Sequence, residues 1–504
     1  MVNYILLPNQ LFEIKHLPYG VKHIYLFKHE KFYSSGGVKY SPCRLEYINK
    51  CIEEYIDYLK QKKISYTIIN KLNKNINAIA FDPVDHDIIK IYEKYSIEII
   101  DTPQFLLTRE ECYGFINQYG KTKPKDKPTT ESKDTPSPPN PNSIIQMPSM
   151  AVFYKFMRNK LQIYMKQQTP LYGKYSFDEE NRNPLPKDYL PTNNLQFATN
   201  HRVAKRLLKL FVLKRLENFG PYQDAIHYDQ LVYHSALSPM INNGLLIPID
   251  ILTQVLKISP NKKNYSSLEG YIRQLIGWRE YMRIIYLSSG ENFKCKNQFG
   301  NKKSLSKEWF MPTEYMKPID EYQLNKTTGK PIDRLINKSI NKSIDKTTNN
   351  TINRPIDRPI KRSIDKKYYT TGITLLDYYI QYVEQHGYLN HIIRLMLIGC
   401  YLFMKETKPS DVYTWFMVKF LDAYDWVMFG NVYYMSQFTE PFFTKRPYIC
   451  SSNYINRMSN GLFSTNDQNE WDSIYKDFVI KHQHQLKHFY MMYPHIKKAK
   501  SIKV

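Results

Sequence analysis

The chain has 504 residues, long enough for two or three domains, and its 71 basic and 47 acidic residues leave a net charge of +24. This surplus favours an anionic partner such as nucleic acid, although basic tails or a basic proteome would give the same balance. The six cysteines form no CxxC pair, no apolar run approaches the ~18 residues of a membrane span, and no signal-peptide pattern opens the chain. These features argue against a zinc or disulfide framework and predict an intracellular protein without a membrane segment.

Residues 1–118 alternate short apolar runs with longer helical stretches. Alternation of this kind predicts an α/β domain with a Rossmann-like parallel sheet. We expect a long helix over 44–63 and strands over 4–7, 23–27, 66–69, 78–81 and 97–100.

Residues 119–150 form a predicted linker, because the segment is rich in Pro, Lys, Ser and Thr and buries too little apolar surface to offset chain entropy.

Residues 151–504 show helical periodicity and predict a large all-α domain. The clearest apolar stripes run over 203–219, 268–287, 375–404 and 412–428.

A basic insertion, residues 325–367, interrupts this helical domain. Its isoleucines recur every four residues, which makes no stable stripe on a helix of 3.6 residues per turn, and Pro355 and Pro359 would break a helix. We predict a disordered segment, which is either a nucleic-acid-binding tail or a neutral repeat expansion.

Seven ungapped blocks, in this order, resemble the iron–sulfur bacterial cryptochromes and prokaryotic (6-4) photolyases of the photolyase/cryptochrome superfamily. They are 173–182 (GKYSFDEENR), 219–225 (FGPYQDA), 234–239 (HSALSP), 269–281 (EGYIRQLIGWREY), 391–396 (HIIRLM), 435–438 (MSQF) and 451–458 (SSNYINRM). The resemblance implies that the helical domain binds FAD, and that the protein is a light-driven lyase acting on UV-damaged DNA.

The resemblance also implies which residues hold the flavin. Flavin phosphates need hydroxyls, backbone N–H groups and a cation. In this family they lie on the loop that contains His234, Ser235, Leu237 and Ser238 here. By the same resemblance, the flavin is also contacted by Gln274, Arg279 and Asn431. Without the resemblance, the same segments would be interpreted as a capped amphipathic helix and a turn.

His391 is the main catalytic candidate implied by the resemblance. Repair of a (6-4) photoproduct needs a proton as the electron arrives, and histidine titrates near neutrality. Asn390 stands where the family usually has a second histidine, and Met435 matches a methionine that lines the lesion pocket. A histidine on a helix surface is the ordinary alternative for His391.

Trp415 and Tyr424 match positions of an electron-transfer chain between flavin and surface. Phe416 stands where a tyrosine is common and is a poor hole carrier. The outermost family tryptophan is replaced near Tyr369 or Thr370, and most such aromatic residues in any protein are core.

Three departures from the family pattern change the expected cofactors. The cluster cysteines are absent near Leu375 and after Met458, so we expect no iron–sulfur cluster and no other metal. Met428 replaces a glutamate near the flavin. Pro8 and Asn9 alter the end of the first strand, which makes a lumazine-type antenna uncertain.

Three functions are therefore compatible with the sequence. The first is a (6-4) photolyase with FAD as cofactor, UV-damaged DNA as partner and a monomeric state. The second is a cryptochrome-like blue-light photoreceptor, which keeps the flavin without repair. The third is a non-catalytic nucleic-acid-binding relative.

Overall fold

The computed structural model describes residues 1–121, 145–180, 182–191, 195–289, 295–310, 371–440, 443–444 and 446–501. The predicted basic insertion and most of the predicted linker lie outside these residues, as do Tyr369 and Thr370. At the two ends of the predicted linker, Lys121 and Gln146 pair as an antiparallel β-bridge.

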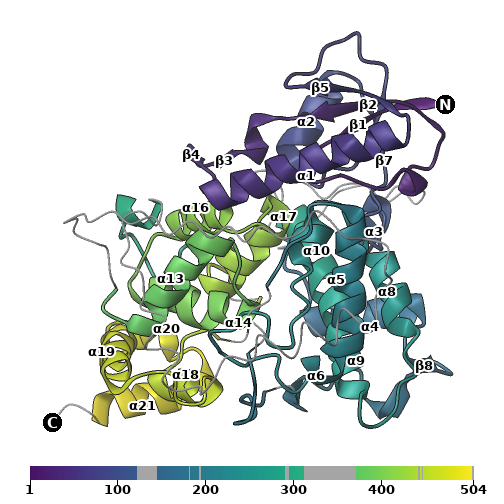
Figure 1. The fold of residues 1–504 in the computed structure, drawn as a ribbon. Helices are drawn as coiled ribbons and strands as arrows, with labels where there is room; N and C mark the ends of the chain where they lie inside the picture. The colour runs from purple at the N-terminus through teal and green to yellow at the C-terminus, as the bar shows by residue number, and fades with distance from the viewer. Residues whose placement is uncertain are drawn as a thin grey trace. The chain divides into compact units, whose positions relative to one another are not determined.

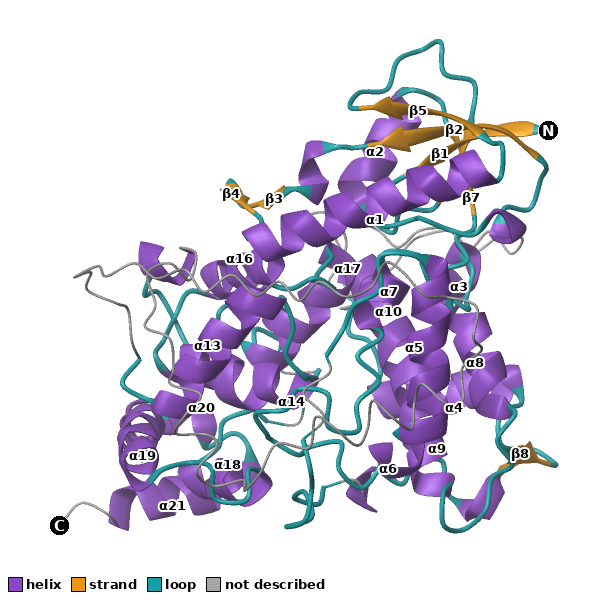
Figure 2. Cartoon of the chain, viewed as in Figure 1, coloured by secondary structure: helices purple, strands orange, loops and turns teal. Residues whose placement is uncertain are grey.

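A five-stranded sheet forms the N-terminal part, with strand order β5-β2-β1-β6-β7 (Figures 1 and 2). All four neighbouring pairs are parallel, and in the central pair Tyr4 lies opposite Ile24. The predicted parallel sheet is therefore confirmed. The strands are β1 (Val2–Leu6), β2 (Val21–Phe27), β5 (Ser65–Ile69), β6 (Ile79–Phe81) and β7 (Glu98–Ile100), and a small antiparallel pair joins β3 (Ser34–Ser35) to β4 (Val38–Lys39).

The helices of this part begin at side-chain caps. The Ser41 hydroxyl accepts from the Arg44 N–H at the start of α1 (Pro42–Gln61), and the Asp85 carboxylate caps α2 (His86–Lys94). Thr108 opens a capping box at α3 (Arg109–Tyr119). Two short 3₁₀ turns, η1 (Ile14–His16) and η2 (Glu30–Phe32), lie in the connections.

The regular secondary structure of the described remainder is helical apart from one short hairpin, β8–β9, which confirms the predicted all-α part (Figure 2). Its first half contains α4 (Met150–Leu161), β8 (Met165–Lys166), β9 (Thr169–Pro170), η4 (Leu171–Gly173), η5 (Asp178–Glu180), α5 (His201–Lys214), α6 (Leu216–Phe219), α7 (Ser238–Asn242), α8 (Pro248–Leu256), α9 (Tyr265–Ile272), η6 (Arg273–Arg279), α10 (Glu280–Ser289) and η7 (Lys307–Phe310). Its second half contains α13 (Thr374–His386), α14 (His391–Ile393), η9 (Arg394–Gly399), α15 (Cys400–Met404), α16 (Pro409–Lys419), α17 (Asp425–Met428), η10 (Phe429–Ser436), α18 (Ser452–Met458), α19 (Thr465–Lys481), α20 (Gln483–Leu486), η11 (Tyr490–Met492) and α21 (Tyr493–Ser501).

Three of the predicted helical stretches are interrupted, and here the predicted spans are wrong: 203–219 breaks at Arg215, between α5 and α6, and two later stretches break as well. The stretch 375–404 breaks at Gly387, whose φ of 61° ends α13, and helix resumes at the Asn390 cap. The stretch 412–428 breaks after Lys419 and resumes at Asp425. Apolar periodicity continues across these two later breaks because the residues between the helices are also buried, so the sequence pattern did not reveal them.

Three of the helical segments have π geometry: η6, η9 and η10. A π turn inserts one extra residue into a helix and is frequent at functional sites. These segments carry Gln274, Arg279, Arg394, Asn431 and Met435, so most of the helix-borne site candidates lie on them.

Without cluster cysteines, the C-terminal helices are expected to pack around Leu375, Leu462 and Phe463; Leu375 and Phe463 are buried, whereas Leu462 is only half-buried. Among the described helices, none combines the length and the apolar character that a membrane crossing requires.

Candidate functional site

The candidate site is built around Asp422, a buried carboxylate in the break between α16 and α17. Arg394 binds it with two parallel hydrogen bonds, Nη1 to Oδ1 at 2.8 Å and Nη2 to Oδ2 at 3.0 Å. The Ser238 hydroxyl donates to Asp422 Oδ2 at 2.6 Å. Burial opposes the charge on Asp422, but Arg394 and Ser238 outweigh it and lower the pKa of this carboxyl group. Asp422 therefore remains ionised.

Arg279 extends this network through α7. The Asn242 amide donates to the Asp422 carbonyl oxygen at 2.7 Å, and the Arg279 guanidinium donates to the Asn242 side-chain oxygen. Arg279 also lies over the rings of Trp426, at 4.6 Å, and Phe105, at 4.8 Å. Burial lowers its pKa to about 10, which still leaves it charged at neutral pH.

The loop before α7 has a strained backbone. Val232 and Ala236 have φ values of 41° and 51°, which are unusual for residues with a side chain and costly for a β-branched one. Such strain persists only where surrounding contacts hold it. Here the Arg215 guanidinium donates to the His234 carbonyl oxygen at 3.0 Å, and the Ser235 hydroxyl bonds to Tyr271.

Two predicted site histidines, His234 and His391, have lowered pKa values. Burial lowers the pKa of His234 to about 4, and the proximity of His391 adds to the effect. Burial and the Arg394 cation likewise lower the pKa of His391 to about 4, against an opposing effect of Asp422. Solvent nevertheless reaches the His391 ring. Because both pKa values are lowered, both rings are neutral at pH 7.

Four of the predicted site residues carry a buried polar atom without a hydrogen-bond partner. These atoms are His234 Nε2, Gln274 Nε2, Arg279 Nε and Asn390 Nδ2. Leaving a buried donor or acceptor unpaired costs roughly 1–3 kcal/mol, so native proteins rarely do it. Three of these residues, His234, Gln274 and Arg279, are predicted flavin contacts and Asn390 is a predicted catalytic residue, so their unpaired atoms are available to a polar ligand.

The remaining predicted residues have other local roles. Leu237 is buried at the N-cap of α7, and the Asn390 side-chain oxygen caps α14 by accepting from Ile393 N at 3.2 Å. Asn431 and Met435 lie on η10, which packs against η9. Asn431 donates to Val427 O at 2.8 Å within its own helix, and Met435 is buried.

Trp415 and Tyr424 lie in different aromatic clusters. Trp415 packs against Trp309, with ring centroids 5.7 Å apart, and donates to the Trp309 carbonyl oxygen at 2.9 Å. The ring contact of Tyr424 is with Phe32, at 6.5 Å, and the Arg44 guanidinium lies 5.6 Å from its centroid.

Sequence reasoning missed Asp422, Asn242 and Trp309. The available signal for Asp422 was a lone acidic residue inside the apolar run 420–424, since a buried carboxylate requires a partner. Asn242 and Trp309 had no such signal, because both lie outside the seven blocks that carry the family resemblance.

Asn9 and Gln10, in the region of the predicted antenna, are buried at the end of β1. The Gln10 amide donates to the Asp82 carbonyl oxygen at 3.0 Å, and the Gln104 amide donates to the Asn9 and Asn242 carbonyl oxygens. These amides thus connect the sheet to α7, and the lumazine-type antenna stays a prediction.

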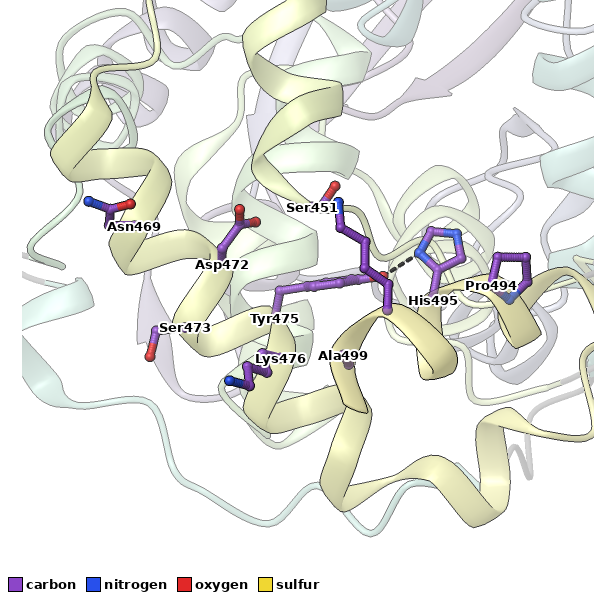
Figure 3. Close-up of a pocket in the computed structure, with 10 residues that line it drawn as sticks. Ser451, Asn469, Asp472, Ser473, Tyr475, Lys476, Pro494, His495 and Ala499 are labelled. Carbon is purple, nitrogen blue, oxygen red and sulfur yellow. Dashed lines mark hydrogen bonds between the residues drawn. The ribbon is translucent and has the colours of Figure 1, made fainter. Parts of the chain in front are cut away.

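A separate cavity of about 440 Å³ lies between α19 and α21 (Figure 3). Its lining includes Ser451, Asp472, Tyr475 and His495, and the Tyr475 hydroxyl is hydrogen-bonded to His495 Nδ1.

Comparison with known proteins agrees with these features. Residues 145–225 match the family model described as deoxyribodipyrimidine photo-lyase-related protein. A (6-4) photolyase of Agrobacterium fabrum is 30% identical over 380 residues, which cover 67% of this chain and 64% of that protein. The chain thus spans less than two thirds of the length of this relative.

Other similar proteins include the uncharacterized protein R853 of Acanthamoeba polyphaga mimivirus, 41% identical over 103 residues that cover 20% of this chain and 78% of that protein. Among solved structures, a bacterial class III photolyase from Agrobacterium tumefaciens aligns over 99% of this chain and 98% of its own, with a TM-score of 0.48 and 12% identity. A Synechocystis cryptochrome aligns over 97% and 88%, with a TM-score of 0.46 and 11% identity. From the family-model match and the sequence relative, the chain belongs to the photolyase/cryptochrome superfamily.

Proposed function

We propose that this protein is a DNA photolyase that binds FAD and uses light to repair the (6-4) photoproduct in UV-damaged DNA. The observation that carries this proposal is the set of four unpaired polar atoms on His234, Gln274, Arg279 and Asn390. They belong to three segments of the chain: the loop with His234, the π segment η6 with Gln274 and Arg279, and the cap residue Asn390.

FAD fits the chemistry of these residues. Ser235, Ser238 and the backbone at Leu237 would hold its phosphates, and Arg279 would supply the cation that a pyrophosphate needs. Gln274 and Asn431 would supply amide groups to the isoalloxazine and its linker. When bound, the reduced flavin supplies an electron to the lesion after it absorbs light.

His391 would transfer a proton to the lesion, with Asn390 positioning its helix and Met435 lining the lesion pocket. With a pKa near 4, His391 is neutral in the free protein. Its role as a donor therefore requires the pKa to rise in the complex. The phosphates of bound DNA and flavin act in that direction, because a nearby negative charge favours the imidazolium.

Trp415 is the better candidate of the two predicted electron carriers. Its indole packs against a second tryptophan, Trp309. Tyr424 lies beside the Arg44 guanidinium, and a neighbouring cation disfavours a positive hole on the ring.

The test is light-dependent repair by the purified full-length chain. An absorbance band near about 450 nm would establish bound oxidised flavin. The reduced protein is then illuminated with an oligonucleotide that carries a (6-4) photoproduct, with a cyclobutane dimer as the competing lesion. We expect repair of the (6-4) product in light and none in the dark.

His391→Ala should lower the repair rate by about 10²–10⁴-fold, which is the usual contribution of a general acid. His386→Ala is the matched control, because His386 is an exposed histidine on α13. Flavin binding without repair of either lesion would contradict the proposal and indicate a photoreceptor. Equal repair by His391→Ala would remove His391 from the mechanism.

A further inference from the structure

A continuous row of buried aromatic rings leads away from Trp415 toward the C-terminal helices. Trp309 lies 5.7 Å from Trp415, Tyr401 lies 6.4 Å from Trp309, and Trp471 lies 6.5 Å from Tyr401, measured between ring centroids. Each step is within the range of direct ring contact. All four rings are at most 4% exposed, so a reductant in solution does not touch the row directly.

The row ends at two buried cysteines. Tyr401 directly follows Cys400 in the chain, and the Trp471 indole N–H donates to the Cys450 carbonyl oxygen at 2.9 Å. Cys450 Sγ lies 3.8 Å from the Met396 carbonyl oxygen. Cys400 is four residues after Met396 and therefore lies on the same helical face. Cys400 is also the largest single influence that raises the pKa of Cys450, so the two side chains lie close together.

The pair is protected from reagents in solution. Cys400 is fully buried and Cys450 is 6% exposed. The proximity of Cys400, together with burial, raises the pKa of Cys450 well above its usual value, so Cys450 remains a thiol rather than a reactive thiolate. The cavity between α19 and α21 nevertheless brings solvent close, because the next residue, Ser451, and nearby Asp472 are in its wall (Figure 3).

We propose that Cys400 and Cys450 are an internal two-electron donor, which forms a disulfide when light drives electrons along the Trp471–Tyr401–Trp309–Trp415 row. This inference rests on the proposed function, since the acceptor is oxidised FAD. In two one-electron steps the pair loses two electrons and both thiol protons, and one S–S bond forms. FAD gains the two electrons and one proton. The second proton leaves through the cavity.

The experiment counts thiols in the full-length protein with its flavin. The oxidised protein is illuminated without oxygen and without an added reductant, denatured, alkylated and analysed by mass spectrometry. The chain has six cysteines, so we expect six alkylated thiols in the dark and 6 − 2 = 4 after illumination, with a Cys400–Cys450 linked peptide pair.

Three variants make the assignment specific. Cys450→Ser should lose no thiol pair in light. Trp309→Phe should keep the flavin and, after illumination, all six thiols, because phenylalanine is a poor hole carrier. If Cys450→Ser fails to fold, Trp309→Phe still tests whether the thiols supply the electrons. Cys295→Ser is the control: Cys295 is exposed, and its replacement should leave the light-dependent loss of two thiols unchanged.

The outcomes separate this inference from the proposed function. Bleaching of the flavin band with six thiols retained would overturn the internal donor and leave the photolyase proposal intact. Disulfide formation in Trp309→Phe at the wild-type rate would overturn the aromatic route. A preparation that binds no flavin would overturn both proposals together.

Discussion

At the scale of single residues, Asp422 connects the polar groups of the site. It accepts two hydrogen bonds from Arg394 and one from Ser238, and its backbone carbonyl accepts one from Asn242. Removing one partner of a buried ion pair costs about 3–5 kcal/mol, because the remaining charge is left without compensation. Burial is the main cause that lowers the pKa of the neighbouring His391; the Arg394 cation lowers it further, and the Asp422 carboxylate raises it.

Arg394→Gln should raise the pKa of His391 from its value of about 4, because it removes the cation that lowers the pKa and leaves Asp422, which raises it. The measurement is an NMR titration of histidine-labelled protein, with His391→Gln to assign the resonance. Arg206→Gln, an exposed arginine on α5, is the control and should change nothing. If repair uses protonated His391, repair should fall as pH rises through the pKa in the complex. An unchanged titration in Arg394→Gln would refute this electrostatic account.

At the scale of secondary-structure elements, two helix breaks create the site. The break 387–390 supplies Asn390, the break 420–424 supplies Asp422, and the Leu421 N–H donates to the Gly387 carbonyl oxygen at 2.9 Å. Gly387 has a φ of 61°, and a Cβ atom there would lie 2.6 Å from the Leu421 side chain. Only glycine satisfies both the left-handed backbone and this close approach.

Gly387→Ala should destabilise the protein by about 2–4 kcal/mol, which combines roughly 1 kcal/mol for the left-handed backbone with about 1–3 kcal/mol for overpacking. It should also lower the flavin content, since both breaks would shift. Gly37→Ala is the matched control: its φ is also positive, at 79°, but nothing lies within 4 Å of the added atom. Urea unfolding and the ratio of flavin to protein absorbance measure the two effects. Equal losses in both variants would show that the contact with Leu421 is unimportant.

At the scale of the whole molecule, Asp82 connects the sheet to the helices. It lies just after β6 and accepts from Arg109 Nε at 2.9 Å, on α3, and from Arg283 Nη2 at 2.8 Å, on α10. Burial opposes its charge, but the two arginines lower its pKa to about 2. Because the folded-state pKa is depressed, the stabilisation is present above pH ~4 and is lost as pH falls toward 2. A shift of this size corresponds to about 2 kcal/mol.

Asp82→Asn should cost about 3–5 kcal/mol of unfolding free energy at pH 7, because two buried guanidinium groups lose their carboxylate. The variant should also lose less stability than wild type between pH 4 and pH 2, since this carboxyl group no longer titrates. Asp57→Asn is the control: Asp57 pairs with Lys60 at the surface and should contribute less than about 1 kcal/mol. Parallel acid-dependence curves for wild type and Asp82→Asn would contradict the assignment.

The sequence by itself determined the parallel sheet, the helical character of the larger part and the family. These follow from local apolar periodicity and from ordered blocks of residues, which are properties of neighbouring positions. It also directed attention to the loop with His234 and Ser238, to Arg279 and to His391. Only the tertiary structure decided that Asp422 links Ser238 to Arg394, and that the two predicted long helices break at 387–390 and 420–424. The proximity of Cys400 to Cys450, and the packing of Trp309 against Trp415, likewise depend on segments distant in the chain. Apolar periodicity indicates which residues are buried, but not which buried residues contact each other. Hydrogen bonds, ion pairs and thiol contacts form only between residues that the folded chain brings together.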